Sequence, residues 1–334
     1  MGGTFLWITE KEVAGAVSMS GAIAALERGL RIEAQGKARN MVKTHVNFGG
    51  HGNLHAIGAA FDESELSPAV VGTKTWAHTP GGAMPVLVMI DGANGALIAV
   101  IEAFALGQLR TGGISGVATK WLSSPEADEL AVIGAGKQAL PQVAAVACVR
   151  KLKRVRVFSP TAEKREAFGG ILRKRFPGTE VVVAGSVAEA VKGAPAVTLV
   201  TRATEPFLGA RMLAAGTHVN AVGAITPERA EFHQDLFPRA HRMAADSVDQ
   251  MKKLSREFQD HFGEDATGWK SLESLASVVA SGKGRSPGDD LSLFKAMGVG
   301  ISDLSIGIEV LRAAHAGKFG RELPLPQRAE IRFD

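Results

Sequence analysis

Several residues of this chain have the types and the spacing that nucleotide chemistry requires. Between Glu129 and Ala147, the apolar run Leu130–Ile133 breaks into Gly134-Ala-Gly-Lys-Gln-Ala139, and a run with helical spacing follows. This order predicts a strand, a glycine turn and a helix. Two glycines let the backbone approach a pyrophosphate, a third small residue lets the helix pack on the strand, and the helix N-terminus offers N–H groups. We interpret the turn as a dinucleotide site, with a plain tight turn as the alternative; its cofactor-binding residues are then Gly134, Gly136, Lys137, Gln138 and Ala139.

The end of the next expected strand, Arg154–Phe158, bears on which dinucleotide binds. An Asp or Glu at that place accepts a hydrogen bond from the ribose 2′-hydroxyl of NAD. Here Ser159 and Thr161 stand at the tip, where there is no carboxylate, and Lys164 and Arg165 come just after. Hydroxyls and cations suit a 2′-phosphate, so we favour NADP(H) as the cofactor. NAD(H) remains possible, because Ser and Thr also suit a bare ribose.

Two cations in apolar surroundings are candidates for binding a carboxylate. Arg110 lies in the glycine-rich segment Leu106–Gly113, and its planar guanidinium can hold a carboxylate through two hydrogen bonds. Lys74 interrupts a strand-like stretch. A lysine on a partly buried strand requires an oppositely charged partner or has a functional role. The alternatives are an arginine that ties two domains together and a lysine that faces solvent.

Composition excludes several classes of protein. With 46% hydrophobic and 22% charged residues, the chain of 334 residues is typical of a globular protein with two domains. The net charge is only +4 and the basic residues are scattered, so no nucleic-acid partner is expected. No apolar run is long enough to span a membrane and no signal peptide is recognisable, so we expect no membrane partner and a cytoplasmic location. The single cysteine, Cys148, fits a reducing compartment and a place in the core, and the absence of tyrosine excludes a tyrosine proton donor.

Alternating periodicities predict the architecture of the larger part of the chain. After the glycine turn, short runs that suit strands alternate with short helical runs. This alternation is typical of βαβ units and a doubly wound, mostly parallel sheet, that is, a Rossmann α/β domain. We assign it to residues 115–300, with Gly282–Asp290 as a mobile polar loop. The expected strands are 130–133, 154–158, 180–184, 196–201, 217–222 and 242–246, and the expected helices include 163–175, 187–192 and 210–216.

The first third of the chain has a different pattern. Ser20–Gln35 has the spacing of an amphipathic helix, and strand-like pieces divided by Gly, Asn and Pro follow it. These pieces predict antiparallel strands in a meander, with a turn at Asp91–Gly95. The helical run Ser302–Ala316 is expected to return to this part, so that residues 1–114 and 301–334 form a discontinuous α+β domain. The expected strands are 42–48, 55–61, 70–76, 85–91 and 96–102, and a helix is expected over 104–122.

Five motifs occur in an order that resembles one known family. They are Gly72-x-Lys74, Leu106-Gly-Gln-Leu-Arg110-Thr-Gly, Gly134–Ala139, His218-Val-Asn-Ala-Val-Gly-Ala224 and Phe294-x-x-x-Gly298-Val-Gly-x-x-Asp303. Their order and spacing, over nearly the whole chain, are similar to the ornithine cyclodeaminase/mu-crystallin family. The resemblance implies a Rossmann domain that binds NAD(H) or NADP(H). It also implies a homodimer, with a substrate and dimerisation domain built from the N-terminal part and the C-terminal helix.

The same resemblance supports the two cations and extends the cofactor site. It favours Lys74 and Arg110 as substrate-binding residues, with Lys74 also catalytic. It adds Thr111, Val222 and Gly298 to the residues that bind the cofactor. No metal is expected, since the histidines near the strands of the first domain lack the spacing of a zinc site.

Two departures from the family pattern bear on the activity. Family members often carry an arginine shortly after a segment like Gly36-Lys-Ala; here Lys43 stands at that place as a substrate-binding residue, with Arg39 close by as the alternative. Cyclodeaminases carry an aspartate where this chain has Ile225. An isoleucine can neither hold an amino group nor move a proton, which argues against ornithine cyclisation.

Three functions remain open. The first is an NAD(P)H-dependent reductase or dehydrogenase of a small α-imino (ketimine) or α-amino acid, a carboxylate-bearing partner that Arg110 and Lys43 hold while hydride passes to the imine carbon. The second is a cyclodeaminase-type lyase, and the third is a non-enzymic, NADP-dependent binding protein of the mu-crystallin kind. We favour the reductase. The substrate side chain, the direction of reaction and the proton donor, Lys74 or His78, stay open.

Overall fold

The protein is described by a computed structural model over residues 3–62 and 69–333, in which it forms two compact units. Unit 1 comprises Met1–Ser18, Gln35–Gly107 and Val299–Asp334, and unit 2 comprises Met19–Ala34 and Gln108–Gly298. The helix α3 (Phe104–Leu122) runs from one unit into the other. The functional boundaries expected from the sequence, 1–114 with 301–334 and 115–300, stay a prediction.

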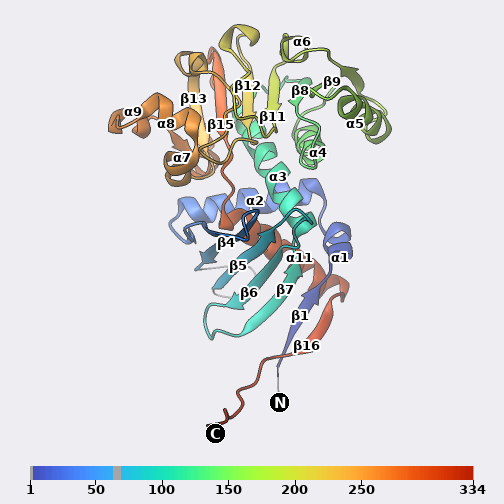
Figure 1. Ribbon diagram of the computed structural model, residues 1–334, viewed down its shortest axis with the longest axis vertical. Helices are drawn as coiled ribbons and strands as arrows, with labels where there is room; N and C mark the ends of the chain where they lie inside the picture. The colour runs from blue at the N-terminus through green and yellow to red at the C-terminus, as the bar shows by residue number, and fades with distance from the viewer. Residues whose placement is uncertain (1–2, 63–68, 334) are drawn as a thin grey trace. The chain divides into compact units, whose positions relative to one another are not determined.

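Unit 2 contains a parallel sheet with the strand order β10-β9-β8-β11-β12-β15-β13-β14, in the upper part of Figure 1. All its strand pairs are parallel. The central strands are almost wholly buried, as expected where helices cover both faces, while β10 at the edge is half-exposed. The predicted α/β class with a Rossmann sheet is confirmed. The strands are β8 (Glu129–Ile133), β9 (Arg154–Phe158), β10 (Glu180–Val183), β11 (Ala196–Leu199), β12 (His218–Ala221), β13 (Ala240–Ala245), β14 (Glu273–Ser274) and β15 (Leu291–Lys295).

The helices of unit 2 follow the apolar spacing of the sequence. Side chains of α4 and α5 pack with β8 and β9 in one core, and the remaining strands pack in a second core. The expectation that Cys148 is a core residue is wrong: it lies near the end of α4 on the exposed face. The helices are α2 (Met19–Ala34), α4 (Ala139–Val149), α5 (Ala162–Arg175), α6 (Val187–Val191), α7 (Val248–Leu254), α8 (Arg256–Phe262), α9 (Ala266–Lys270) and α10 (Leu275–Ser281).

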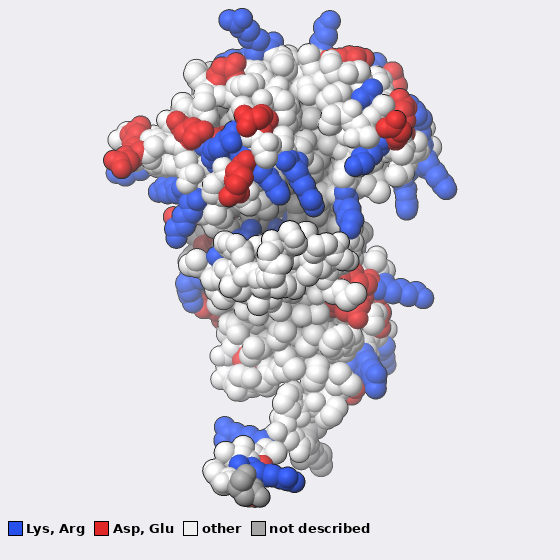
Figure 2. Space-filling view, viewed as in Figure 1, with Lys and Arg blue, Asp and Glu red and all other residues white. Residues whose placement is uncertain are grey.

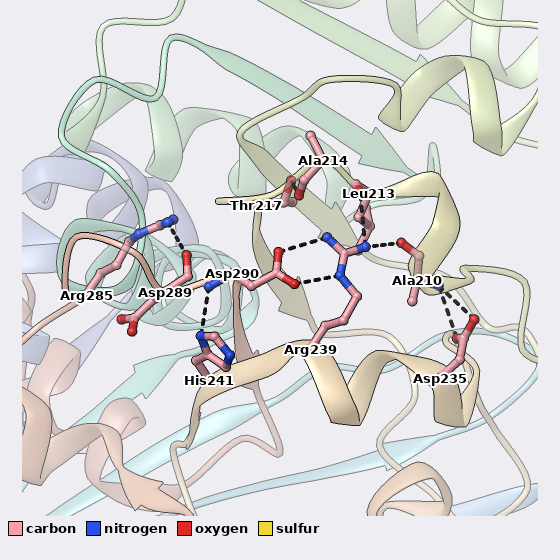
Figure 3. A network of polar contacts seen from close by, with 10 residues as sticks. All are labelled: Ala210, Leu213, Ala214, Thr217, Asp235, Arg239, His241, Arg285, Asp289 and Asp290. Carbon is pink, nitrogen blue, oxygen red and sulfur yellow. Dashed lines mark hydrogen bonds and ion pairs between the residues drawn. The ribbon is translucent and has the colours of Figure 1, made fainter.

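One polar network of unit 2 corrects the helix expected over 210–216 and ties the end of the loop 282–290, whose mobility stays a prediction (Figure 3). The helix expected over 210–216 is only a 3₁₀ turn, Ala210–Met212, because the Arg239 guanidinium takes the carbonyls of Ala210 and Leu213. The loop 282–290, expected to be mobile, is tied at its end by Asp290, which accepts from Nε and Nη2 of Arg239 at 2.7 and 2.8 Å. Arg285, within the loop, donates to the carbonyl of Asp289 in the same loop and to that of Gly216, just before β12. Irregular backbone is stabilised here by guanidinium donors rather than by helix.

Unit 1 contains a mostly antiparallel sheet with the order β16-β1-β7-β6-β5-β4-β2, and β3 pairs with β4. The predicted meander is confirmed for β4 to β7, whereas β1, parallel to β7, and β16 were not expected. The strands are β1 (Thr4–Ile8), β2 (Ala38–Asn40), β3 (Thr44–Phe48), β4 (Gly52–Phe61), β5 (Val70–His78), β6 (Val86–Asp91), β7 (Leu97–Glu102) and β16 (Arg321–Pro324), and a short helix is α1 (Glu10–Ala16).

The C-terminal helix α11 (Gly300–Gly317) packs on β4, β5 and β6, so unit 1 is discontinuous, as expected. The helix starts in direct contact with the sheet: a Cβ at Gly300 would overlap the carbonyl of Gly58. The amide of Ile301 donates to Oδ1 of Asn40 at 2.8 Å. These contacts fix the first turn of α11 against β2 and β4. Among the described helices, none has the length and apolar character needed to cross a bilayer.

Candidate active site

The glycine turn of unit 2 has the geometry that a diphosphate requires. Gly134 adopts φ +122°, and a Cβ there would lie 2.6 Å from the carbonyl oxygen of Val200, so only glycine fits. A Cβ at Gly136 would meet no atom within 4 Å, so the backbone is open on that side. The helix α4 begins at the buried Ala139, and Gln138 before it makes no side-chain cap. The space above Gly136 and the uncapped helix start fit a pyrophosphate.

The other expected cofactor residues lie at the same edge of the sheet. Ser159, Thr161 and Lys164 follow β9, Val222 follows β12, and Gly298 comes shortly after β15. Because these strands are parallel neighbours of β8 or lie further along the same sheet, their carboxyl ends form one edge. Ligands of open parallel sheets bind outside this edge. The structure thus brings these residues to the side of the sheet where the glycine turn lies.

The end of β9 holds one cation close to the strand. Arg165 donates from Nη1 to the carbonyl of Ser159 at 3.0 Å, and its guanidinium carbon lies 5.7 Å from the ring centroid of Phe158. Ser159 is buried, while Thr161 and Lys164 are exposed. Two hydroxyls and two cations therefore follow β9, at the strand end where an open parallel sheet of this kind reads the 2′ position of a dinucleotide.

Arg110 lies against a loop that a buried carboxylate holds. A Cβ at Gly298, which has φ +79°, would overlap the Arg110 guanidinium, so glycine is required there. The amides of Met297 and Gly298 donate to the two oxygens of Asp246 at 2.7 and 2.8 Å. Asp246 is 3% exposed and directly follows β13. On the same helix as Arg110, Thr111 accepts a hydrogen bond from Nε2 of Gln142 at 3.0 Å through its carbonyl.

A second carboxylate near Asp246 makes stability depend on pH. Burial, together with the charge of Asp246, raises the pKa of Glu33 from 4.5 to about 7. A raised carboxyl pKa means that the folded state binds the proton of Glu33 more tightly than the unfolded state does. The contribution of Glu33 to the free energy of unfolding is therefore full below pH 4.5 and is lost as the pH rises through about 7. At about 1.4 kcal/mol per pKa unit, the full loss is on the order of 3–4 kcal/mol. We predict that Glu33→Gln abolishes this decline in urea unfolding between pH 5 and 8, whereas Glu166→Gln on exposed α5 retains it; an unchanged pH profile in Glu33→Gln would contradict the prediction.

In unit 1, Lys74 is buried on β5 and paired with a carboxylate from α11. Its side chain is 5% exposed, and its Nζ lies 2.5 Å from Oδ1 of Asp303, which is 1% exposed. Lys74 therefore does not face solvent, the alternative that the sequence left open. Gly107 at the start of α3 is also close, since a Cβ there would lie 3.9 Å from Nζ. The two charged groups are thus paired with each other in a buried place.

Aromatic and cationic side chains surround this lysine on β3, β4 and β5. The Nζ of Lys74 lies 5.2 Å from the ring centroid of Trp76, and Trp76 stacks on His55 at 4.8 Å. Burial lowers the pKa of His55, and so do the charges of Lys43, His45 and His78. The concentration of positive charge suits an anionic ligand.

Lys43 and Arg39 differ in their surroundings. Arg39 is engaged at the surface by Asp62, with Nη2 and Oδ1 2.5 Å apart and both side chains about half-exposed or more. Lys43 lies just before β3, close enough to His55 for its charge to lower the pKa of that histidine. Lys43 as a substrate-binding residue, with Arg39 as the alternative, stays a prediction.

The sequence did not single out Asp303 or Asp246 as site residues. Asp303 stands in the first turn of an otherwise apolar helix, within the fifth motif, and Asp246 directly follows an expected strand. Two features of the sequence could have indicated the Lys74–Asp303 pair: a carboxylate within an apolar segment, and a lysine on a buried strand that requires a counter-charge. His218 of the fourth motif is structural: it opens β12, bonds to Ser292 and Asn220, and burial lowers its pKa to about 3.

Comparisons with known proteins agree with this geometry. A family model described as the ornithine cyclodeaminase/mu-crystallin family matches residues 6–318. Ketimine reductase mu-crystallin from Mus musculus is 32% identical over 232 residues, which is 70% of this chain and 70% of that protein. The structure of Thermococcus litoralis Delta(1)-pyrroline-2-carboxylate reductase in complex with NADH and L-proline superimposes with a TM-score of 0.87 at 25% identity, covering 96% of this chain and all of that one.

A third similar structure is an archaeal alanine dehydrogenase dimer with bound NAD. It has a TM-score of 0.87 at 25% identity, and the match covers 96% of this chain and 99% of that chain. The glycine turn, the parallel sheet, the discontinuous unit 1 and the match over residues 6–318 lead to one conclusion. The chain belongs to the ornithine cyclodeaminase/mu-crystallin family.

Proposed function

We propose that the protein is an NAD(P)H-dependent reductase of a small α-imino acid or ketimine, an oxidoreductase that acts on carbon–nitrogen bonds. The relatives named as reductases of pyrroline-2-carboxylate and of ketimines, and the alanine dehydrogenase, support this class. The observation that carries the proposal is the buried ion pair between Lys74 and Asp303, because it provides a protonated amine away from bulk water. Ile225, where a cyclodeaminase would need a carboxylate, favours the reductase over the lyase.

The residues divide the work as follows. A bound nicotinamide dinucleotide supplies the hydride. Gly134, Gly136 and the start of α4 bind its diphosphate. Arg110 and Lys43 bind the α-carboxylate of the substrate, and Lys74 delivers a proton to the imine nitrogen while Asp303 keeps the ammonium protonated and oriented. The protein thus positions two reactants and one proton.

The direct test is a screen of cofactor oxidation. NADPH and NADH are offered with pyrroline-2-carboxylate, piperideine-2-carboxylate, iminosuccinate, and pyruvate with ammonia or methylamine, and absorbance is followed at the nicotinamide band. Turnover of one of these imines is expected. Ornithine with catalytic NAD is the opposing arm: steady ammonia release without net cofactor reduction would establish the lyase instead. A protein that binds the dinucleotide but turns over no substrate in either arm would be a binding protein.

We predict a preference for NADPH over NADH. Ser159 and Thr161 at the end of β9 are not carboxylates, and Lys164 and Arg165 follow them, so a 2′-phosphate would gain charge-assisted hydrogen bonds there. The measurement compares kcat/KM for the two cofactors in the wild type and in Lys164→Ala, with Lys174→Ala on the same helix as the matched control. A wild-type preference for NADH would show that the two hydroxyls bind a bare ribose.

Arg110→Ala is predicted to act mainly on substrate binding. A guanidinium that holds a carboxylate in the ground state and in the transition state contributes about 1.5–3 kcal/mol, equivalent to roughly a 10- to 100-fold rise in KM with kcat little changed. Steady-state kinetics against the imine concentration measure this, with Arg211→Ala, an exposed arginine of the same unit, as the control. A fall in kcat with unchanged KM would instead give Arg110 a role that begins only in the transition state.

We propose further that the protein is a homodimer. Exposed large apolar side chains lie on β3 and β4 and in the segments just before β3 and β6: Met41, Val42, Val46, Phe48, Leu54 and Met84. In Figure 2, much of the visible surface of unit 1 carries no Lys, Arg, Asp or Glu. Exposed apolar side chains gathered in this way are typical of an interface. Light scattering with Val46→Asp/Phe48→Asp, which should be monomeric, tests the proposal.

A further inference from the structure

A second buried charge cluster lies at the carboxyl edge of the parallel sheet. Glu231 is wholly buried, and its carboxylate joins two loops. Its Oε1 accepts from the amide and the hydroxyl of Thr201, both at 2.7 Å, in the loop after β11. Its Oε2 accepts from the amides of Gly223 and Ala224 at 2.8 and 3.1 Å, in the loop after β12. One side chain therefore connects the loops that follow two adjacent parallel strands.

The backbone amide of Glu231 is hydrogen-bonded to a buried ion pair. Its amide donates to Oε1 of Glu257 at 3.1 Å, and Glu257 also accepts from Nζ of Lys295 at 3.1 Å and from the hydroxyl of Ser255 at 2.8 Å. Lys295 is the last residue of β15, the next strand of the sheet, and is fully buried. Buried charges of this kind cost free energy compared with apolar side chains of similar size. Packing alone therefore does not explain why buried charged side chains gather at the ends of β11, β12 and β15.

The two loops are also in direct contact. A Cβ at Gly223 would overlap the backbone of Thr201 and would lie 2.5 Å from Oε1 of Glu231. Glycine is thus required for the loops to meet around the carboxylate. The position of residues 222–225 follows from these contacts.

The strand order indicates which part of a dinucleotide these loops meet. The glycine turn follows β8, and the hydroxyls of Ser159 and Thr161 follow β9, on one side of β8. A dinucleotide that crosses the carboxyl edge with its diphosphate at β8 and its adenosine at β9 must extend its other half toward β11 and β12. These two strands carry the loops that Glu231 joins.

We propose that Glu231 is a positioning residue that sets the loops after β11 and β12 in the form that binds the nicotinamide half of the dinucleotide. The inference rests on the proposed function. A carboxylate accepts with both oxygens, so it holds both loops together. The glutamine amide has the same size but only one oxygen that accepts. Its NH₂ group takes the place of the other oxygen and faces backbone N–H donors, so one of the two loops is no longer held.

The test compares Glu231→Gln with Glu228→Gln, an exposed glutamate of the same segment. Isothermal titration calorimetry measures the affinity for NADPH and, separately, for 2′,5′-ADP, which contains only the adenosine half. Amide hydrogen exchange is followed over residues 200–225. We expect Glu231→Gln to bind NADPH about 10-fold or more weakly, to bind 2′,5′-ADP as the wild type does, and to exchange faster in these loops. Glu228→Gln should match the wild type.

Normal NADPH affinity and normal exchange in Glu231→Gln would overturn the inference, and so would an equal loss for NADPH and 2′,5′-ADP. If Glu231→Gln does not fold, Thr201→Ala, which removes one hydroxyl donor and leaves the buried charges paired, makes the same comparison with a smaller expected loss of about threefold. The outcomes for the inference and for the proposed function can be told apart. If the wild-type protein binds neither NADPH nor NADH, both are overturned. If the wild type binds normally and Glu231→Gln is unaffected, only the inference is overturned.

Discussion

Lys74→Ala is expected to lower kcat by about 100-fold or more, the range that a general acid contributes, while dinucleotide affinity stays the same. Lys74 is buried on β5, and its ammonium lies 2.5 Å from Asp303. Without it, no amine remains at this place to protonate the imine nitrogen as hydride arrives. Single-turnover kinetics with the best imine substrate separate this step from product release.

The carboxylate partner provides a matched variant. Asp303→Asn keeps the size of the side chain but removes the charge that holds the ammonium, so kcat should fall and its pH profile should shift to lower pH, since a lysine without a nearby carboxylate loses its proton more readily. Removal of one partner of a buried pair also costs about 3–5 kcal/mol of stability. The double variant Lys74→Met/Asp303→Leu should recover stability without recovering activity. If Lys74→Ala keeps a near-normal kcat, the lysine only binds the carboxylate, and the proton comes from water or from a histidine such as His78.

Gly136→Val is expected to abolish dinucleotide binding and to leave the fold intact. A Cβ at Gly136 would meet no protein atom within 4 Å, so the valine side chain takes up open space. In the proposed complex that space belongs to the diphosphate, which needs close contact with the backbone. The loss of several charge-assisted hydrogen bonds corresponds to about 100-fold or more in affinity. Energy transfer from the four tryptophans to bound NADPH measures it.

Gly170→Val is the control for this variant. Gly170 lies on the exposed face of α5 in the same unit, and a Cβ there also meets no atom within 4 Å. Both variants should melt close to the wild type, but only Gly136→Val should lose NADPH and NADH. Wild-type affinity in Gly136→Val would remove the premise that the turn binds a dinucleotide.

Local signals made the parallel sheet and the glycine turn predictable. The run Leu130–Ile133, the glycines and the following helix are contiguous, so strand, turn and helix could be read without knowledge of the rest of the chain. The meander of β4 to β7 was equally local, because each strand pairs with its successor. The short helix expected at Ala210–Gly216 failed because its helical propensity was overridden by Arg239, which comes from a distant segment.

Partners that are distant in sequence were not predictable. The burial of Lys74 implied a partner, but Asp303 is 229 residues away, and no spacing rule connects them. The strand β15 was missed for a similar reason: five residues, LSLFK, follow a polar loop, and their strand conformation depends on pairing with β12 and β13 on both sides. Glu231 looks like an ordinary surface glutamate in the sequence, and only the meeting of two loops gives it a role.

The discontinuous build of unit 1 has a consequence for how the chain is made. During synthesis, residues 108–298 of unit 2 leave the ribosome as one continuous stretch and can fold as soon as they emerge. The meander of unit 1 is made earlier, but it must wait for α11 to cover it and for β16 to pair with β1, where Thr4 faces Pro324. Until then, a strand with a lysine at its centre lacks the carboxylate that will neutralise it. All strands of the parallel sheet are therefore synthesised before Asp303, the partner of the proposed proton donor.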